Sequence, residues 1–181
     1  MKATGIVRRI DDLGRVVIPK EIRRTMRIRE GDPLEIYTDR EGEVIFKKYS
    51  PIGELSSFAS QYADTLHKIC DLNVVICDRD AVIACAGVSK KEYMDKSVTD
   101  EMENVIENRT FYMYKTGDKT FSITNDASHF VSCAMPIITE GDLIGCVCSV
   151  TTVSEQNQSP SDTEVKLIQT AANFLSRQLE S

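Results

Sequence analysis

The chain has 181 residues, with 22 Lys and Arg against 28 Asp and Glu and a formal net charge of −6 at pH 7. This length allows one large domain or two small ones. No apolar run approaches the roughly 18 residues that a membrane span needs, and the first residues lead into strand-like sequence without the apolar core of a signal peptide. We therefore expect a cytoplasmic protein with no membrane partner.

Catalytic and metal-binding motifs are scarce in this sequence. The six cysteines lie among apolar neighbours, as buried free thiols do, and Cys146-Val147-Cys148 lacks the two-residue spacer of common zinc and redox motifs. No Gly-rich phosphate loop or nucleophile elbow occurs, and isolated histidines such as His67 and His129 are more often structural or exposed than catalytic. We expect no enzyme activity, no cofactor and no metal.

Charge is distributed unevenly along the chain. Residues 1–29 hold nine Lys and Arg against three Asp and Glu, a net +6, whereas residues 50–181 hold ten against 19, a net −9. Such asymmetry indicates a basic binding segment joined to an acidic part with another role. The overall negative charge therefore does not exclude nucleic acid as a partner.

The most informative stretch is residues 14–28. Val16–Ile18 is a β-branched run that predicts a strand, and Pro19 then predicts the start of a short helix. On that helix the cationic side chains fall within one arc of about 100° and Ile22 and Met26 lie opposite; the cations are Lys20, Arg23, Arg24 and Arg27. A solvated helix surface is one interpretation, but the clustering favours an anion-binding face of the kind that contacts nucleic acid.

Three further strands are predicted around this helix. Residues 4–10 read as a strand, and residues 34–37 and 44–49 read as a hairpin whose loop spans residues 39–42. Four strands and one helix in about 50 residues bury too little surface to be comfortably stable alone. We therefore expect a two-fold dimer, which would also place two basic faces side by side.

Residues 1–50 closely resemble the AbrB-type, swapped-hairpin DNA-binding domain of bacterial transition-state regulators. The runs that carry the resemblance are Thr4–Arg9, Asp12–Pro19, Arg23–Thr25 and Gly31–Tyr37. The resemblance implies hairpins that interleave between two protomers, and it implies that Arg8, Arg15, Arg23 and Arg24 contact DNA. Lys20 and Arg27 are added to this set by helix geometry. With its longer C-terminal part, the chain resembles sporulation regulators whose second domain is GAF-like.

Residues 51–181 are predicted to form a second domain of the α+β class, with an antiparallel sheet flanked by helices. Helices are expected at 52–70, 90–94, 100–107 and after the capping box Ser161–Glu164, and strands at 74–77, 81–85, 111–114, 120–124, 130–138 and 143–151. Residues 156–160 form a polar break before the last helix. This plan agrees with a GAF-like domain.

The first and last helices of this domain are predicted to assemble subunits. Their apolar stripes recur at helical spacing, so they can pack on their own sheet or form a bundle with the same pair from another copy. The residues assigned to the bundle are Leu55, Phe58, Tyr62, Val165, Ile168, Ala172, Leu175 and Leu179. The expected assembly is a homodimer through the first domain and a homotetramer through these helices.

A small-molecule pocket is the second hypothesis for this domain, since GAF-like domains bind ligands beside the sheet. Residues 124–129 are predicted to be a lid over a pocket lined by Phe111, Phe121, Phe130 and Cys133. A purely oligomerising, signal-transmitting role is the alternative. For the whole chain the favoured function is a transcription regulator with double-stranded DNA as its partner, and the competing one is an antitoxin-like module that binds a partner protein.

Overall fold

The structure is a computed structural model that describes residues 5–152 and 159–180. It divides into two compact units, Met1–Tyr49 and Ser50–Ser181, which are described separately. The sequence analysis placed the boundary between the two domains one residue later, after Ser50.

The described part of the first unit, residues 5–49, contains one helix and one hairpin. Helix α1 spans Lys20–Thr25, and strands β1 (Leu34–Thr38) and β2 (Val44–Lys48) pair antiparallel with Leu34 opposite Lys48. The carboxylate of Asp39 accepts backbone N–H bonds from Glu41 and Glu43, at 3.0 and 2.9 Å, and so fixes the hairpin loop. The predicted hairpin is therefore confirmed.

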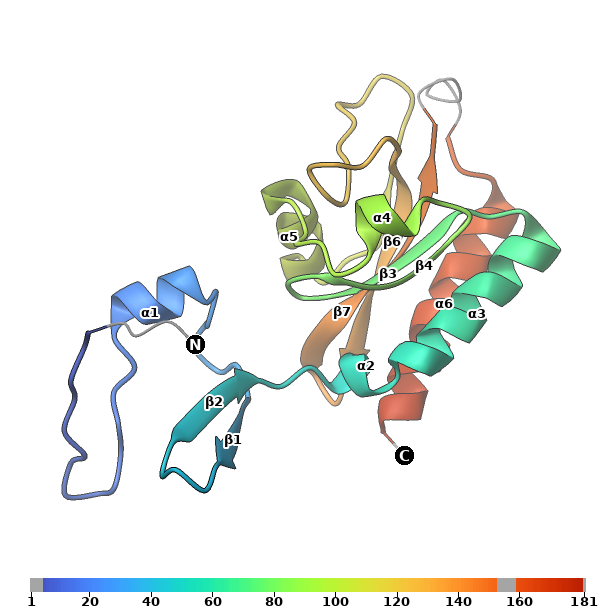
Figure 1. Cartoon of the computed structure of the whole chain (residues 1–181). Coiled ribbons are helices and arrows are strands. Elements are labelled where there is room, and N and C mark those ends of the chain that lie inside the picture. Colours follow the sequence, from blue (N-terminus) through green and yellow to red (C-terminus); the bar gives the residue numbers. More distant parts are fainter. Residues whose placement is uncertain (1–4, 153–158, 181) are drawn as a thin grey trace. The chain divides into compact units, whose positions relative to one another are not determined.

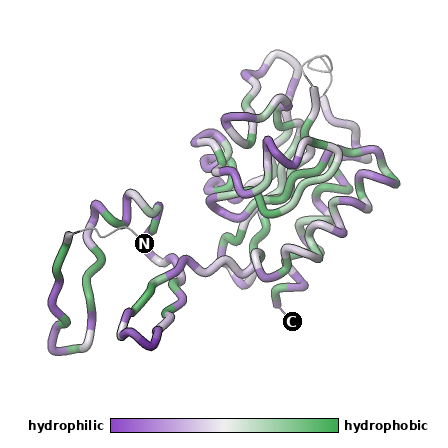
Figure 2. The backbone as a smooth tube through the Cα atoms, viewed as in Figure 1, coloured by the Kyte–Doolittle hydropathy of each residue, from purple (hydrophilic) through white to green (hydrophobic). Residues whose placement is uncertain are grey.

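The strands predicted at residues 4–10 and 16–18 do not form in the single chain. Residue 4 lies outside the described residues, and residues 5–18 have no strand assignment. Figure 2 shows hydrophobic residues along this segment, and Val7 and Val17 are 90% and 70% exposed. A strand needs a neighbour for its backbone groups and its apolar side chains, and no strand among the described residues pairs with the segment.

The second unit is a sheet with helices on both faces (Figure 1). Its strands are β3 (Val74–Asp78), β4 (Val82–Ala86), β5 (Tyr112–Met113), β6 (Phe130–Thr139) and β7 (Asp142–Thr151). Its helices are α2 (Pro51–Glu54), α3 (Ser56–Cys70), α4 (Lys90–Tyr93), α5 (Asp100–Glu107) and α6 (Asp162–Leu179). All strand pairs are antiparallel, in the order β4-β3-β7-β6-β5.

Alternation along the strands divides the core into two clusters. On β3, Val74 and Ile76 pack with α2, α3 and α6, whereas Val75 and Cys77 pack with α4 and α5 on the other face. This is the period of two that a strand imposes on its side chains. A sheet buried on both faces explains why β6 and β7 are apolar almost throughout.

Local sequence signals account for most helix boundaries in this unit. The hydroxyl of Ser161 accepts the Glu164 N–H at 3.2 Å, which confirms the predicted cap of α6. The helix expected at 52–70 is instead two helices that meet at Leu55.

Residues 120–124 form no strand, although the carbonyl of Phe121 accepts one backbone hydrogen bond from the Val131 N–H at 2.9 Å. Most of the predicted polar break, residues 156–158, lies outside the described residues.

The described residues contain neither a membrane-spanning helix nor a metal-binding cluster. No helix among them is long and apolar enough to cross a membrane. Across residues 5–152 and 159–180, no group of three or more His, Cys, Asp or Glu side chains is placed to hold a metal ion.

Candidate nucleic-acid interface

Helix α1 presents its basic side chains to solvent. Lys20, Arg23 and Arg24 are exposed, and no residue of the helix is buried. Pro19 directly precedes the helix with φ −57° and is itself buried, so it fixes the point at which the chain turns into α1. The structure thus brings three of the six predicted DNA-binding residues onto one short element.

Arg27 lies beyond the helix, which corrects the sequence-based geometry. The helix ends at Thr25, and Arg27 has a left-handed backbone with φ +50°. The Ile28 N–H donates to the Arg23 carbonyl at 2.7 Å, a bond that spans five residues and closes the helix end as in a Schellman motif. Arg27 is exposed, but a helical arc of 100° per residue does not describe where it points.

Lys48 fixes the turn that follows α1. Its Nζ donates to the Arg27 carbonyl at 2.8 Å and lies 3.6 Å from Oδ2 of Asp32. Asp32 in turn accepts the Arg29 N–H at 2.8 Å. The end of β2 therefore holds the left-handed turn, and with it the last part of the basic segment.

Arg8 and Arg15 belong to the segment before α1. Arg8 is exposed in its extended part. Arg15 follows a tight turn in which the Asp11 N–H donates to the Arg15 carbonyl at 3.0 Å and the Gly14 N–H donates to the Asp11 carbonyl at 3.0 Å. Gly14 has φ +77°, a conformation that glycine adopts without strain.

Asp11 organises this turn with its carboxylate. Oδ1 accepts the N–H groups of Leu13 and Arg15 at 3.0 and 2.7 Å, and Oδ2 accepts Nε of Arg15 at 2.8 Å. The backbone and side-chain hydrogen bonds from Arg15 lower the pKa of Asp11 below its ordinary value. The Asp-x-x-Gly spacing signals such a turn in the sequence, but it does not show which side chain the carboxylate binds.

The predicted assembly residues of α6 are largely buried within their own subunit. Ile168, Ala172 and Leu175 are 0%, 1% and 0% exposed and pack in the cluster beneath α3 and α6. The bundle seam drawn through them is therefore wrong, because the sheet of the same chain occupies that face. Leu55 and Val165 are half-buried, and Leu179 packs against the cluster from its edge.

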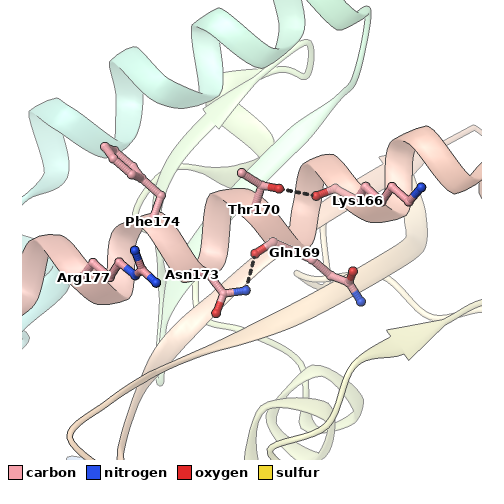
Figure 3. Close-up of a pocket in the computed structure, with 6 residues that line it drawn as sticks. All are labelled: Lys166, Gln169, Thr170, Asn173, Phe174 and Arg177. Carbon is pink, nitrogen blue, oxygen red and sulfur yellow. Dashed lines mark hydrogen bonds between the residues drawn. The ribbon is translucent and has the colours of Figure 1, made fainter.

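The outer face of these helices carries an aromatic group. Phe174 is 39% exposed, and its ring centroid lies 5.8 Å from that of Phe58 and 5.5 Å from that of Tyr62, with which it stacks. Phe174 also lines a surface pocket on α6 (Figure 3). The other lining residues are Lys166, Gln169, Thr170, Asn173 and Arg177. Sequence periodicity missed Phe174, since it lies off the apolar stripe.

The four predicted ligand-pocket residues are divided between the two faces of the sheet. Phe111 and Cys133 pack in the cluster beneath α3 and α6, and Phe121 packs in the cluster beneath α4 and α5. The ring of Phe130 packs edge to face against that of Tyr114, with 5.4 Å between the ring centroids. Burial raises the pKa of the Cys133 thiol well above its ordinary range, so this thiol is a packing group.

Comparison with known proteins decides the family. A family profile described as "Stage V sporulation protein T C-terminal, transcription factor" matches residues 54–180. The chain is 50% identical over 182 residues to stage V sporulation protein T of Bacillus subtilis (strain 168), an alignment that covers 99% of each protein. The chain belongs to the stage V sporulation protein T family. It is thus a transcription regulator of the sporulation type, as the sequence analysis expected.

Each unit also has its own relatives. The chain is 65% identical over 51 residues to the transition state regulatory protein AbrB of Bacillus subtilis (strain 168), covering 28% of this chain and 52% of that protein. A profile described as "Antidote-toxin recognition MazE, bacterial antitoxin" matches residues 7–53. The GAF domain of a phosphoenolpyruvate-protein phosphotransferase from Coxiella burnetii is similar to the fold, with TM-score 0.52, 15% identity, and coverage of 70% of this chain and 82% of that domain. The α+β class and the GAF-like fold are confirmed.

Proposed function

We propose that the first unit binds double-stranded DNA through its exposed cations. The proposed contacts are Arg8, Arg15, Lys20, Arg23, Arg24 and Arg27. All six side chains are exposed, and they lie within residues 1–29, which have a net charge of +6. This exposure, in a chain of a transcription-factor family, is the observation that supports the proposal. Lys and Arg that neutralise phosphates provide most of the affinity, and arginine contacts to base edges or to groove shape add selectivity.

The exposed apolar residues of the first unit support a dimer. Besides Val7 and Val17, Ile10 and Leu13 are each 69% exposed and Ile36 is 61% exposed. A soluble unit of this size rarely leaves so many large apolar side chains in water. A second copy whose residues 5–18 pair with the same segment would supply the missing strand neighbours, as in the swapped-hairpin arrangement that the sequence resembles.

The second unit is proposed to join two such dimers into a tetramer. Phe58, Tyr62 and Phe174 form an aromatic patch on the outer face of α3 and α6. Covering this patch with its copy from another subunit would bury large side chains that dominate interface energetics. This patch replaces the buried stripe of α6 as the proposed contact. The divided positions of Phe111, Phe121 and Cys133 support no single ligand site.

Binding of a partner protein is the second candidate function, and the antitoxin profile over residues 7–53 favours it. The second unit argues the other way, since it is a folded domain with two buried clusters rather than a short tail that could wrap a toxin. A DNA-binding measurement distinguishes the two functions. A DNA-binding unit retains a labelled duplex at low salt, whereas a protein-docking unit does not.

The test compares charge variants of the full-length chain on a fluorescein-labelled 30-base-pair duplex. Arg23→Ala and Arg24→Ala should each weaken binding by roughly fivefold or more in a dimer that uses both copies, with no change of mass in solution. Lys91→Ala is the matched control, because Lys91 is an exposed cation on α4 of the second unit. Equal affinities for all three variants and the unaltered chain would contradict the proposed interface.

A further inference from the structure

An acidic residue lies within the most basic segment of the chain, next to one of the proposed DNA contacts. Oδ2 of Asp11 accepts Nε of Arg15 at 2.8 Å, and the two side chains are 33% and 69% exposed. A carboxylate facing a polyanion opposes binding by charge alone. The contact that Asp11 makes with Arg15 acts against this repulsion.

Three hydrogen bonds join the Asp11 carboxylate to the turn and to Arg15. The carboxylate holds both the backbone N–H of Arg15, at 2.7 Å, and the side-chain Nε of the same residue. The main chain and the guanidinium of Arg15 are therefore tied to one group. The remaining freedom of this long side chain is reduced before any ligand arrives, so less conformational entropy is lost on binding.

The hydrogen bond to Asp11 also leaves the two Nη groups of Arg15 available for DNA recognition. The bond to Asp11 uses Nε, and among the described residues the structure records no partner for the two Nη groups. Those groups form a fork that binds guanine O6 and N7, or two phosphate oxygens, with defined direction. An arginine held at Nε is thus presented in one orientation, which matters more for telling sequences apart than for overall affinity.

We infer that Asp11 is a positioning residue that orients Arg15 and thereby sets how strongly the chain distinguishes one DNA duplex from another. The inference rests on the proposed function, because it assigns Arg15 to the DNA interface. The negative charge of Asp11 then weakens DNA binding, whereas the orientation that it gives to Arg15 favours one duplex over another. Asp11 lowers affinity for every duplex and raises the preference for the right one.

The test uses the full-length chain and two duplexes of 30 base pairs. One is selected from a random-sequence pool by the unaltered protein, and the other is a shuffled duplex of the same base composition. Asp11→Asn keeps an acceptor oxygen for the two backbone N–H groups but removes the charge that binds Nε. The measured quantity is the ratio of the two dissociation constants.

We expect Asp11→Asn to lower this ratio by at least fivefold while binding to the shuffled duplex stays equal or becomes up to threefold tighter. In an Arg15→Ala background the same substitution should leave the ratio unchanged, because the oriented group is gone. Arg15→Lys, which keeps the charge but has no Nε–H group in the same place, should lower the ratio even though Asp11 is intact. The result for Arg15→Lys does not depend on how well Asp11→Asn folds.

A merely structural Asp11 would give a different pattern. Equal weakening on both duplexes, or a full effect of Asp11→Asn in the Arg15→Ala background, would overturn the inference while the proposed DNA binding stood. Failure of the unaltered chain to bind either duplex in a salt-dependent way would overturn the proposed function and the inference together.

Discussion

Lys48 donates from Nζ to the carbonyl oxygen of Arg27 at 2.8 Å, and this bond joins the last residue of β2 to the turn after α1. The two residues are 21 positions apart in sequence. The bond ties the hairpin to the basic segment, whose helix has no buried residue of its own. This polar contact therefore helps to hold the turn that follows α1.

Replacing Lys48 with Met should loosen this turn. The substitution keeps a long side chain but removes the donor to Arg27 and the cation beside Asp32, whose side chain is 4% exposed. We expect a loss of about 1–3 kcal/mol in local stability. Hydrogen exchange of the peptide spanning residues 20–34 measures it, with Lys47→Met, an exposed neighbour on β2, as the control. Unchanged protection in Lys48→Met would show that the contact does not hold the turn.

Arg27 provides a test that separates backbone strain from DNA contact. Its φ of +50° costs a residue with a Cβ about 1 kcal/mol, and glycine avoids this cost. Arg27→Gly should therefore stabilise the turn by about 1 kcal/mol relative to Arg27→Ala. Both variants should bind DNA equally and more weakly than the unaltered chain. A difference in affinity between them would mean that the backbone conformation, and not the guanidinium, determines binding.

Gly145 is required by the close approach of β7 to β3. A Cβ at this position would lie 2.1 Å from the carbonyl oxygen of Cys77, a backbone atom that cannot move away. Gly145→Ala should destabilise the second unit by about 3 kcal/mol, measured by chemical denaturation. Gly53→Ala in α2 is the control, since its nearest neighbour is the Ser50 side chain at 3.2 Å. Equal stability of the two variants would contradict the strand contact.

Phe174 and Leu175 are adjacent on α6 but should behave differently when each is replaced by Asp. Phe174→Asp places a charge in the exposed aromatic patch and should halve the molecular mass in sedimentation while the fold persists. Leu175→Asp buries an unpaired charge at a site that is 0% exposed and should unfold the second unit. Thr163→Asp, exposed in the first turn of α6, is the control for added charge. An unchanged mass for Phe174→Asp would refute the proposed tetramer contact.

The buried thiols predict a loss of stability at alkaline pH. Hydrogen bonding to Cys148, followed by burial, raises the pKa of Cys77 above the ordinary value of 9.0. Burial raises the pKa of Cys146 and, together with hydrogen bonding to Cys146, that of Cys148. Because each folded-state pKa exceeds the unfolded one, stability is fully present below about pH 8 and falls as pH rises through 9 and beyond. Denaturation midpoints between pH 7 and pH 10 measure this. A midpoint independent of pH in the cysteine-containing chain would contradict thiol burial.

Local patterns in the sequence predicted the second unit well. Short apolar runs bounded by turn residues predicted β3, β4, β6 and β7, and the capping box Ser161–Glu164 predicted the start of α6, because these signals need only neighbouring residues. The boundary at Leu55 was missed because the apolar spacing continues through the break. The seam on α6 was wrong because periodicity shows that a face is apolar but not which surface covers it.

The candidate interface was only partly predictable for a related reason. Arg23 and Arg24 follow from composition and resemblance, but the roles of Asp11 and Lys48 depend on contacts that the turn and the hairpin create. Residues 5–10 and 16–18 carry strand-like sequence without forming strands in one chain. Their β propensity becomes structure only when a partner strand is present.

The salt dependence of DNA binding by the full-length chain tests the central claim most directly. Anisotropy of a labelled 30-base-pair duplex from 50 to 300 mM NaCl gives the slope of log K against log salt. Six cations from each of two protomers predict a slope of about −11, and Arg23→Ala should reduce its magnitude by about 2. Salt-independent binding, or the same slope in Arg23→Ala, would contradict an arginine-based DNA interface.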